Sequence, residues 1–390
     1  MLTLEKLKCQ KLIIYGAGFL GRDFIYFCKR HNIPIFWILD KKFVQPTKLL
    51  DVNASSLEYF LQYNRNLNDY ILIIAIIKPE IVKKIKENLI NHGVKNFYSF
   101  EKVLEYKDYL NKFYSCSFLE KETSNDPLQN IQITSKAKVG VIFHCYYLDL
   151  LEEFLRYLSN INDLFDLYIS IPPKFKNLKN EIFKKCTNFL KFVHKIKVLF
   201  FPNRGRDIYP FLKILKKYPI CKYDYVLKLH TKKSNFPKIG ELWRKQMCIR
   251  LIGSSRIYEK IKSLFKIKKT GLVIPLGYAM EIRYYLGDNF TKLQKLLQNF
   301  KIPNDYLYSS FFPLGSMFWF KPEVCKDLQK VDLRKIKFEE ERGQIDGTWA
   351  HAFERFFGIL PTVQSYKVMQ IDEEGSIYEV KNFCKIDKNG

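Results

Sequence analysis

The sequence predicts an α/β protein of two domains, each built on a mostly parallel β-sheet flanked by helices. Apolar, β-branched runs alternate with segments of helical spacing along most of the 390 residues, the order that parallel sheets require. A polar stretch at 106–136 interrupts this alternation and is typical of a linker. We therefore expect a first domain at 1–115, a linker at 116–136, a second domain at 137–366 and a C-terminal tail at 367–390.

The first domain begins with a strand, a glycine-rich turn and a helix. Residues 11–15 read KLIIY and lead into GAGFLG, which has the spacing G-x-G-x-x-G. A helix at about 19–29 follows, then a strand that ends at Asp40. In this context the glycines permit a tight turn, the helix N-terminus attracts phosphate and the aspartate can accept from ribose hydroxyls. The glycines of this predicted nucleotide site are Gly16, Gly18 and Gly21.

The rest of the first domain supplies only half of a full dinucleotide-binding fold. A strand at 70–77, a helix at 79–91 and a short strand at 96–99 complete it. This segment resembles the small Rossmann-like domains that accompany sugar-modifying and sugar-transferring enzymes. Nucleotide binding, a packing role and NAD redox chemistry all remain open, although no Tyr-x-x-x-Lys accompanies the glycines.

The second domain repeats the alternation over a longer stretch. Its closing segment, FEEERGQIDGTWAHAFERFFG, reads as a loop followed by a helix. Strands are expected at 139–147, 165–173, 196–201, 223–229, 271–278 and 312–323. Helices are expected at 148–161, 176–195, 207–218, 241–252 and 254–265.

Two strands of the second domain end in polar bursts. The strand at 196–201 runs into NRGRD, and the strand at 223–229 runs into HTKKS. Because ligands of open α/β sheets bind beyond the carboxyl ends of the strands, we expect one site that suits a phosphorylated ligand. Gly205 would let the backbone approach closely or adopt positive φ. The alternative is two surface loops with solvated charges. The cationic side chains concerned are Arg204, Arg206, Lys228, His230, Lys232 and Lys233.

Composition limits the class of partner. The formal charge of +25 indicates an anionic partner, and no zinc-finger, RNA-recognition or helix-turn-helix pattern is present to indicate nucleic acid. A phosphorylated substrate and a weak attraction to an acidic membrane surface remain. Nine scattered cysteines without C-x-x-C suit reduced thiols, and the apolar runs are too short for a membrane span. With no signal-peptide layout, we expect a cytoplasmic protein, at most peripheral to the inner face of the cytoplasmic membrane.

Six segments of the second domain carry a family resemblance. They are DLLEEFLRYL, PNRGRDIYPFL, YDYVLKLHTKKS, GELWR, FPLGSMFW and GQIDGTWAHAFERFFG, in this order between residues 138 and about 360. This region resembles the rhamnan synthesis F family, glycosyltransferases of bacterial cell-surface polysaccharide assembly; the N-terminal domain lies outside the resemblance. It implies transfer of a sugar, often rhamnose, from a nucleotide-diphosphate donor to a growing glycan or lipid-linked glycan.

The same region looks like a single-sheet, GT-A-type glycosyltransferase. In such enzymes a strand ends in Asp-x-Asp, which holds a divalent metal on the donor diphosphate. Here the corresponding strand ends in His230-Thr231-Lys232 and no Asp-x-Asp is present. Since Mg²⁺ and Mn²⁺ prefer carboxylate oxygens, cationic side chains are expected to replace the metal on the leaving diphosphate. No cofactor is certain, and a divalent metal stays open without a motif to hold it.

The resemblance also implies roles for individual residues. In GT-A enzymes a carboxylate at the start of a late helix commonly takes the proton of the acceptor hydroxyl, and Asp346 occupies that place. Its rivals are the acidic run Glu339, Glu340 and Glu341, and its alternative role is a helix N-cap. Gln344 and Thr348 are expected to orient substrate. The donor is expected to contact Asn203, Arg204, Arg206, Asp207, Lys228, His230, Thr231 and Lys232.

Two readings from other classes stay open. The chain could be a non-catalytic nucleotide-sugar-binding or scaffold subunit of a polysaccharide assembly complex, which the missing Asp-x-Asp favours. An NAD-dependent sugar oxidoreductase depends on GAGFLG alone.

Overall fold

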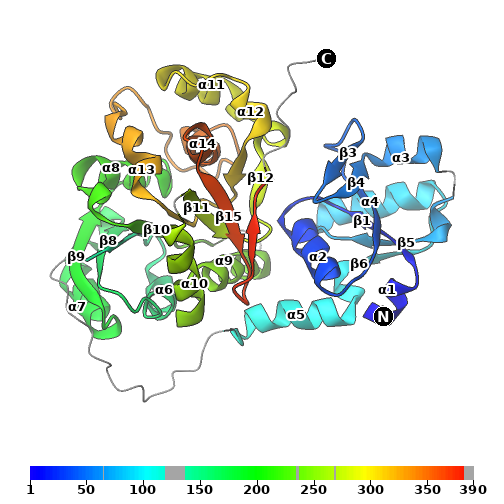
Figure 1. Cartoon of the computed structure of the whole chain (residues 1–390), viewed down its shortest axis with the longest axis horizontal. Helices are drawn as coiled ribbons and strands as arrows, with labels where there is room; N and C mark the ends of the chain where they lie inside the picture. Colours follow the sequence, from blue (N-terminus) through cyan, green and yellow to red (C-terminus); the bar gives the residue numbers. More distant parts are fainter. Residues whose placement is uncertain (65, 119–136, 234–236, 268, 382–390) are drawn as a thin grey trace. The chain divides into compact units, whose positions relative to one another are not determined.

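The chain forms two compact α/β units, Met1–Ser115 and Cys116–Gly390. A computed structural model describes residues 1–64, 66–118, 137–233, 237–267 and 269–381 (Figure 1). The predicted linker spans 116–136, and its residues 119–136 lie outside these described residues. The predicted α/β class is confirmed, since both units combine β-sheets with surrounding helices.

The first unit contains a six-stranded sheet in the order β3-β4-β2-β1-β5-β6. Every neighbouring pair is parallel except β3 and β4. The central strands are buried on both faces, which explains why the sequence reads as continuous apolar runs there. The strands are β1 (Lys11–Tyr15), β2 (Ile35–Leu39), β3 (Thr47–Leu49), β4 (Val52–Ser55), β5 (Tyr70–Ile74) and β6 (Phe97–Ser99).

Five helices accompany this sheet in the described residues. They are α1 (Leu4–Lys8), α2 (Phe19–Arg30), α3 (Leu57–Tyr63), α4 (Pro79–Asn91) and α5 (Leu104–Tyr114). Side-chain oxygens of Thr3 and Ser56 cap α1 and α3, and Pro79 begins α4 at the first turn, where its missing N–H costs nothing. Residues 106–114, at the start of the polar stretch typical of a linker, form most of α5 instead. Tyr106, Tyr109 and Phe113 recur at helical spacing and bury one face of α5.

The second unit is organised around an eight-stranded sheet in the order β16-β15-β11-β14-β10-β7-β8-β9. Strands β10, β7, β8 and β9 are mutually parallel, and β14 runs antiparallel between β10 and β11. The strands are β7 (Val139–His144), β8 (Phe165–Ile171), β9 (Val193–Phe200), β10 (Tyr225–His230), β11 (Thr270–Pro275), β14 (Phe318–Phe320), β15 (Lys367–Ile371) and β16 (Ile377–Glu379). A separate pair joins β12 (Ala279–Glu281) to β13 (Phe311–Pro313).

Helices cover this sheet in two groups. Helix α8 contacts α14, while α6, α9 and α10 pack together (Figure 1). None of the described helices is long and apolar enough to cross a membrane. The helices are α6 (Leu151–Leu158), α7 (Lys179–Phe189), α8 (Ile208–Lys217), α9 (Pro237–Ile252), α10 (Ser255–Lys266), α11 (Phe290–Asn299), α12 (Tyr306–Ser309), α13 (Pro322–Cys325) and α14 (Trp349–Val363).

The second unit differs from expectation at two boundaries. The helix expected at 176–195 ends at Phe189, and β9 already begins at Val193, so the lysines at 195 and 197 belong to a strand. The residues expected to form a tail include β15 and β16, and β15 pairs with β11 inside the sheet. The sheet therefore continues beyond residue 366.

Candidate functional site

The carboxyl ends of β10, β7 and β8 bring a row of polar side chains to one edge of the sheet. His230 is the register partner of His144, which is in turn the partner of Ser170. His144 Nδ1 lies 2.9 Å from Ser170 Oγ. Burial lowers the pKa of His144 to about 4 and that of His230 to about 3. Both rings are therefore neutral at pH 7, and no described residue forms a hydrogen bond with the ring of His230.

Behind this row lies a buried ion pair between Lys228 and Asp207. The Lys228 ammonium is 1% exposed and donates to Asp207 Oδ2, to the Ser316 carbonyl at 2.7 Å and to Ser316 Oγ at 3.0 Å. Burial by itself would raise the pKa of Asp207, but His230, Lys228 and the Ser316 hydroxyl together hold it well below its usual range. All three donors of Lys228 are engaged, so this lysine and Asp207 form an internal anchor between β10 and the start of α8.

The loop after β9 is closed by the acidic run Glu339, Glu340 and Glu341. Arg204 pairs with Glu340 at 3.1 Å, and the Arg206 guanidinium forms a fork with Glu341 at 2.7 and 3.2 Å. Gly205 has φ +61°, and a Cβ there would lie 2.5 Å from the Phe338 ring, which confirms the expected need for glycine. Both arginines of the predicted phosphate site thus have carboxylate partners more than 130 residues away in sequence.

Arg206 also fixes the protonation of His351. Its Nη1 lies 2.9 Å from His351 Nε2, and because a guanidinium can only donate, Nε2 is the acceptor. The proton of the neutral ring therefore lies on Nδ1, which faces Thr348 Oγ1 at 2.8 Å. Burial, Arg206 and Arg355 lower the pKa of His351 to about 4. Thr348 is the N-cap of α14, so the alternative that Asp346 caps this helix is wrong.

Lys232 is the predicted cation whose charge has no ion-pair partner among the described residues. Its ammonium lies 3.5 Å from the centroid of the Trp243 ring and makes no hydrogen bond or ion pair with the described residues. Burial lowers its pKa to about 8; Glu354 and Asp207 act in the opposite direction, and Arg206 adds to the lowering. The backbone beneath it is held by Arg244, which donates to the Lys232 carbonyl at 3.1 Å.

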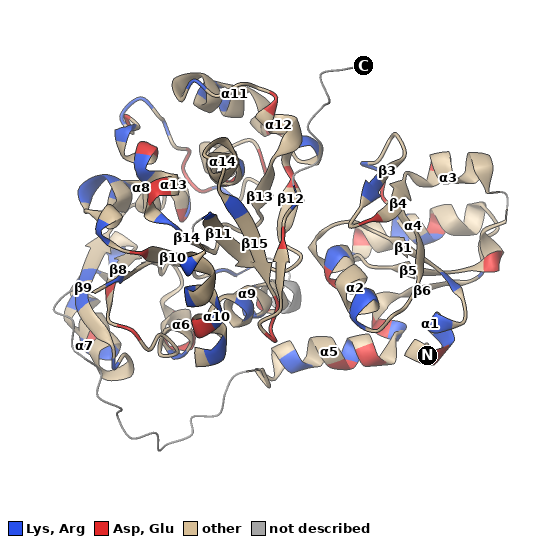
Figure 2. Cartoon of the chain, in the orientation of Figure 1, with Lys and Arg blue, Asp and Glu red and all other residues tan. Residues whose placement is uncertain are grey.

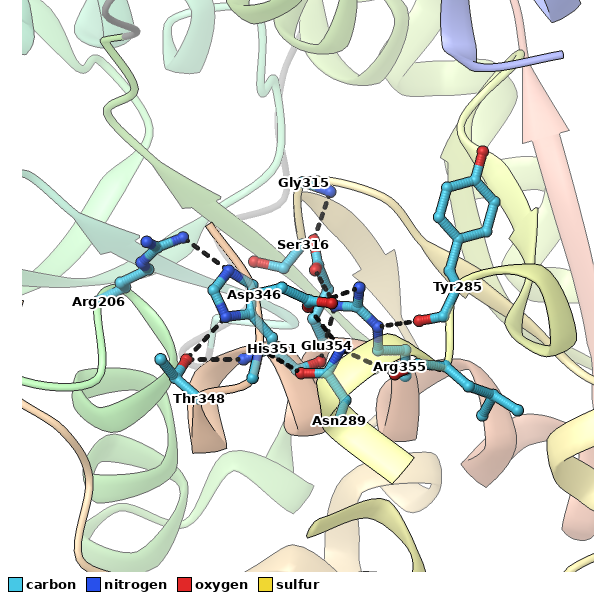
Figure 3. Close-up of polar contacts among 12 residues, drawn as sticks. Arg206, Tyr285, Asn289, Gly315, Ser316, Asp346, Thr348, His351, Glu354 and Arg355 are labelled. Carbon is cyan, nitrogen blue, oxygen red and sulfur yellow. Dashed lines mark hydrogen bonds and ion pairs between the residues drawn. The ribbon is translucent and has the colours of Figure 1, made fainter. Parts of the chain in front are cut away.

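Asp346 precedes α14 and is held by one of its two oxygens. Oδ1 accepts from Asn289 Nδ2 at 2.5 Å and from Arg355 Nη2 at 3.3 Å (Figure 3). Oδ2 accepts no hydrogen bond from the described residues, and the side chain is 31% exposed. Arg355 is itself fixed by the Tyr285 carbonyl at 3.1 Å and by Glu354 at 3.1 Å.

The rival carboxylates are fully engaged. Each has both oxygens in a hydrogen bond or an ion pair, in contrast to Asp346. They are Glu339, Glu340, Glu341 and, on α14, Glu354. Among these carboxylates, Asp346 is therefore the one with an oxygen, Oδ2, that accepts no hydrogen bond from the described residues.

The remaining predicted residues form hydrogen bonds within the protein. Asn203 donates to the Tyr146 hydroxyl at 3.1 Å, and Thr231 Oγ1 accepts from the backbone N–H of Tyr147 at 3.0 Å. The side chain of Gln344 donates to the Glu340 carbonyl and accepts from the backbone of Arg342, so it shapes its own loop.

Several residues of the site were not found from the sequence. His144 ends a strand as His230 does, so its position could have indicated it. For the others no local pattern predicts a role, although three of them lie in FPLGSMFW and GQIDGTWAHAFERFFG, segments that carry the family resemblance. These other residues are Asn289, Ser316, Glu354 and Arg355.

In the first unit, the predicted nucleotide-binding residues lie together at the carboxyl end of β1. Gly16 has φ +116°, and a Cβ on Gly21 would lie 1.9 Å from the Gly16 carbonyl oxygen, so both positions require glycine. Gly18 is the N-cap of α2. The carboxylate of Asp40 accepts from the backbone N–H of Ala17 at 2.8 Å and of Lys42 at 3.2 Å. Asp40 therefore stabilises the glycine turn itself.

No cluster of three or more His, Cys, Asp or Glu side chains that could hold a metal ion occurs in the described parts of the chain. Its eight described cysteines are all free thiols.

Comparison with known proteins supports the resemblance. Residues 68–366 match the family described as Rhamnan synthesis protein F. The match includes part of the first unit, so the expectation that this unit lies wholly outside it is wrong. Two curated relatives from two strains of Xanthomonas campestris pv. campestris, each named Uncharacterized protein WxcX, are 31% identical over 239 residues. The aligned region covers 60% of this chain and 32% of the relatives, so the chain spans about a third of their length.

Proposed function

The chain belongs to the rhamnan synthesis protein F family, and from this premise we propose that it is a glycosyltransferase of polysaccharide biosynthesis. It would move rhamnose, or another deoxyhexose or hexose, from a nucleotide-diphosphate donor to a growing cell-surface glycan. Membership of the family supports a role in polysaccharide synthesis. The proposal of a phosphorylated donor depends on the Lys232 ammonium at the carboxyl end of β10, which has no ion-pair partner among the described residues.

The donor diphosphate is proposed to lie against Lys232. A compact ammonium without an ion-pair partner in the described structure can bind phosphate oxygens without first breaking a salt bridge. Arg204 and Arg206 can join only by exchanging their glutamate partners for phosphate. Lys228 and Asp207 would act indirectly, because their ion pair fixes the end of β10 and thereby positions His230 and Lys232.

Asp346 is proposed as the base that takes the proton from the acceptor hydroxyl. Its Oδ1 is aimed by Asn289 and Arg355, while Oδ2 remains open to a substrate. A base needs this combination of a fixed orientation and one unoccupied oxygen within hydrogen-bond reach. The negative charge that develops on the leaving diphosphate would be stabilised by the cations already in place.

The finer fold assignments belong to the same proposal. The second unit has a mostly parallel sheet with its polar residues at the carboxyl edge, as in a GT-A-like domain. Lys232 would then stand where a metal-binding Asp-x-Asp is found in such enzymes. The first unit would be Rossmann-like, with phosphate received at Gly16 and Gly18 or with a scaffold role.

One observation favours the second candidate, a non-catalytic nucleotide-sugar-binding subunit. Four of the predicted phosphate-binding cations already have carboxylate partners, namely Arg204, Arg206, Lys228 and Lys233. A binding module needs only Lys232 and neighbouring polar groups, whereas a transferase also needs the base.

Asp346→Asn separates the two candidates. The amide keeps the size of the side chain and its bonding to Arg355 but cannot take a proton. A panel of nucleotide sugars is first screened for protection against thermal unfolding, and the best is assayed for hydrolysis and transfer. We expect Asp346→Asn to bind donor like the wild-type protein and to lose roughly 10²–10⁴-fold in turnover.

Glu323→Gln is the control, since it neutralises an exposed carboxylate on α13 to which the proposal gives no role. Donor protection with no turnover in the wild-type protein would establish the binding subunit. Turnover of Asp346→Asn within a few-fold of wild type would remove Asp346 from the mechanism.

A further inference from the structure

An apolar groove flanked by lysines runs along β9, the edge strand of the large sheet. Its volume is about 650 Å³, and its apolar lining includes Val198, Phe200 and Phe201. Four lysines also line it: Lys176, from the segment before α7, and Lys213, Lys216 and Lys217 from α8. The side chains of Lys195 and Lys197 on β9 are exposed as well.

The lysines of this groove keep their charge without a direct acidic partner among the described residues. None of its four lysines forms an ion pair with an acidic side chain of the described residues. The Lys216 ammonium donates to the Val331 carbonyl, and those of Lys213 and Lys217 lie over tyrosine rings, contacts that leave the positive charge in place. Figure 2 shows basic residues on both β9 and α8.

Some surface lysines of this unit do have acidic partners. Lys185 pairs with Glu152 and Glu181, Lys262 with Asp163, and Lys233 with Asp149. The lysines of the groove instead lie together without such partners, beside partly exposed apolar side chains. This combination suits an anionic ligand with an apolar part.

Two kinds of occupant combine these properties. An acidic peptide could add as a strand to β9, but exposed lysines on an edge strand are the usual protection against such pairing, and β9 carries Lys195 and Lys197. An anionic lipid surface requires no backbone pairing. It offers phosphate groups to lysines and an apolar interface to aromatic side chains.

We propose that the groove along β9 docks the protein on an anionic lipid bilayer. The lysines contact phosphate headgroups, and Phe200 and Phe201 lie toward the interfacial region. Because β9 leads directly into the loop of Asn203 and Arg206, a docked bilayer would lie beside the candidate site. Only the step from docking to a lipid-linked acceptor depends on the proposed transferase function.

Vesicle flotation with the full chain tests this proposal. The vesicles are pure phosphatidylcholine, or phosphatidylcholine with about a third anionic phosphatidylglycerol. The test variant is Lys176→Glu with Lys217→Glu, on the two walls of the groove. The control is Lys266→Glu with Lys295→Glu, which makes the same change in net charge at exposed lysines on α10 and α11.

We expect the wild-type protein to float only with the anionic vesicles. Removing two lysines from the contact should weaken binding at least roughly 30-fold, and the control should stay within a few-fold of wild type. Thermal unfolding of all variants shows that they are folded. Equal weakening of test and control variants, or equal binding to pure phosphatidylcholine, would overturn the proposal.

Binding of a soluble polyglutamate peptide tests whether the groove takes an acidic peptide instead. If the peptide binds wild type but not the groove variant, while vesicles bind neither, the groove is a protein-docking site and the lipid proposal is wrong. Vesicle binding is measured without donor or acceptor, so it can succeed or fail independently of glycosyl transfer.

Discussion

Lys232→Met tests the part of the site on which the proposed donor binding depends. Methionine keeps an unbranched apolar stem that can still lie against Trp243, and it removes only the ammonium. Since no ion pair with a described residue is broken, the fold should be retained. Lys233→Met is the matched control, because Lys233 is the exposed neighbour and already pairs with Asp149 at 2.5 Å.

The expected loss follows from the chemistry of one charged contact. A hydrogen bond to a charged group contributes about 1.5–3 kcal/mol, so nucleotide-diphosphate binding should weaken by roughly 10- to 150-fold. The pKa of about 8 adds a pH dependence. The protonated fraction of Lys232 falls from about nine tenths at pH 7 to about one tenth at pH 9, so wild-type affinity should fall about tenfold over this interval.

Few other groups of the site titrate between pH 7 and 9. The pKa values of His144, His230 and His351 are lowered to about 4, 3 and 4, so these rings stay neutral throughout. The diphosphate is essentially fully ionised, since its last pKa is near 6. Lys232→Arg keeps its charge at all these pH values and should therefore bind without the decline.

Calorimetric titration of a nucleoside diphosphate at pH 7 and pH 9 measures both effects. The reasoning is refuted if Lys232→Met binds as tightly as Lys233→Met. It is also refuted if the wild-type decline between the two pH values persists unchanged in Lys232→Met.

Three further predictions concern the metal, the acidic run and the division of the chain. Because cationic side chains are proposed to stabilise the leaving diphosphate, transfer should survive EDTA; complete loss that Mn²⁺ restores would show that carboxylates hold an ion. Glu341→Gln should release Arg206 and raise the affinity for a nucleoside diphosphate by a few-fold. The lost ion pair should lower the free energy of unfolding by about 1–2 kcal/mol. Unchanged affinity would place Arg206 away from the donor. A chain that begins near residue 134 should fold, because the second unit has its own sheet, and its unfolding by circular dichroism should be cooperative; insolubility would contradict this.

Most strands of both sheets could be predicted from the sequence, but β3 and β4 of the first sheet and β15 and β16 of the second could not. Strands such as β1, β5 and β10 are buried on both faces, so they must be apolar throughout and stand out as runs. The short strands β3 and β4 have a mixed pattern that no periodicity reveals. β15 was expected to belong to a tail because nothing local shows that KVMQI pairs with β11, almost a hundred residues earlier in the chain.

In the site too, positions set by neighbouring residues could be predicted, whereas contacts between residues distant in the sequence could not. The positions of the two polar bursts followed from strand ends, and His230 and Lys232 do lie at the carboxyl end of β10. The partners could not be predicted, because Arg206 meets Glu341 through chain topology rather than sequence spacing. Asp346 was selected for its place before a helix, but its orientation depends on Asn289 and Arg355. Asn289 lies outside every segment of the resemblance, and the segment that contains Arg355 does not show that its side chain reaches Asp346.

Lys228 and Lys232 show why residue type alone does not assign a role at such a site. A lysine and an aspartate taken out of water together must each satisfy nearly every hydrogen bond, or desolvation exceeds their attraction. Lys228 meets this condition through Asp207 and Ser316, and it thereby joins β10 to α8 and to the turn before β14. Lys232 lies beyond the strand end, where burial is partial and an aromatic ring replaces the carboxylate. An ammonium in that setting keeps its charge near neutral pH and lacks only a counter-ion, which a donor phosphate would supply.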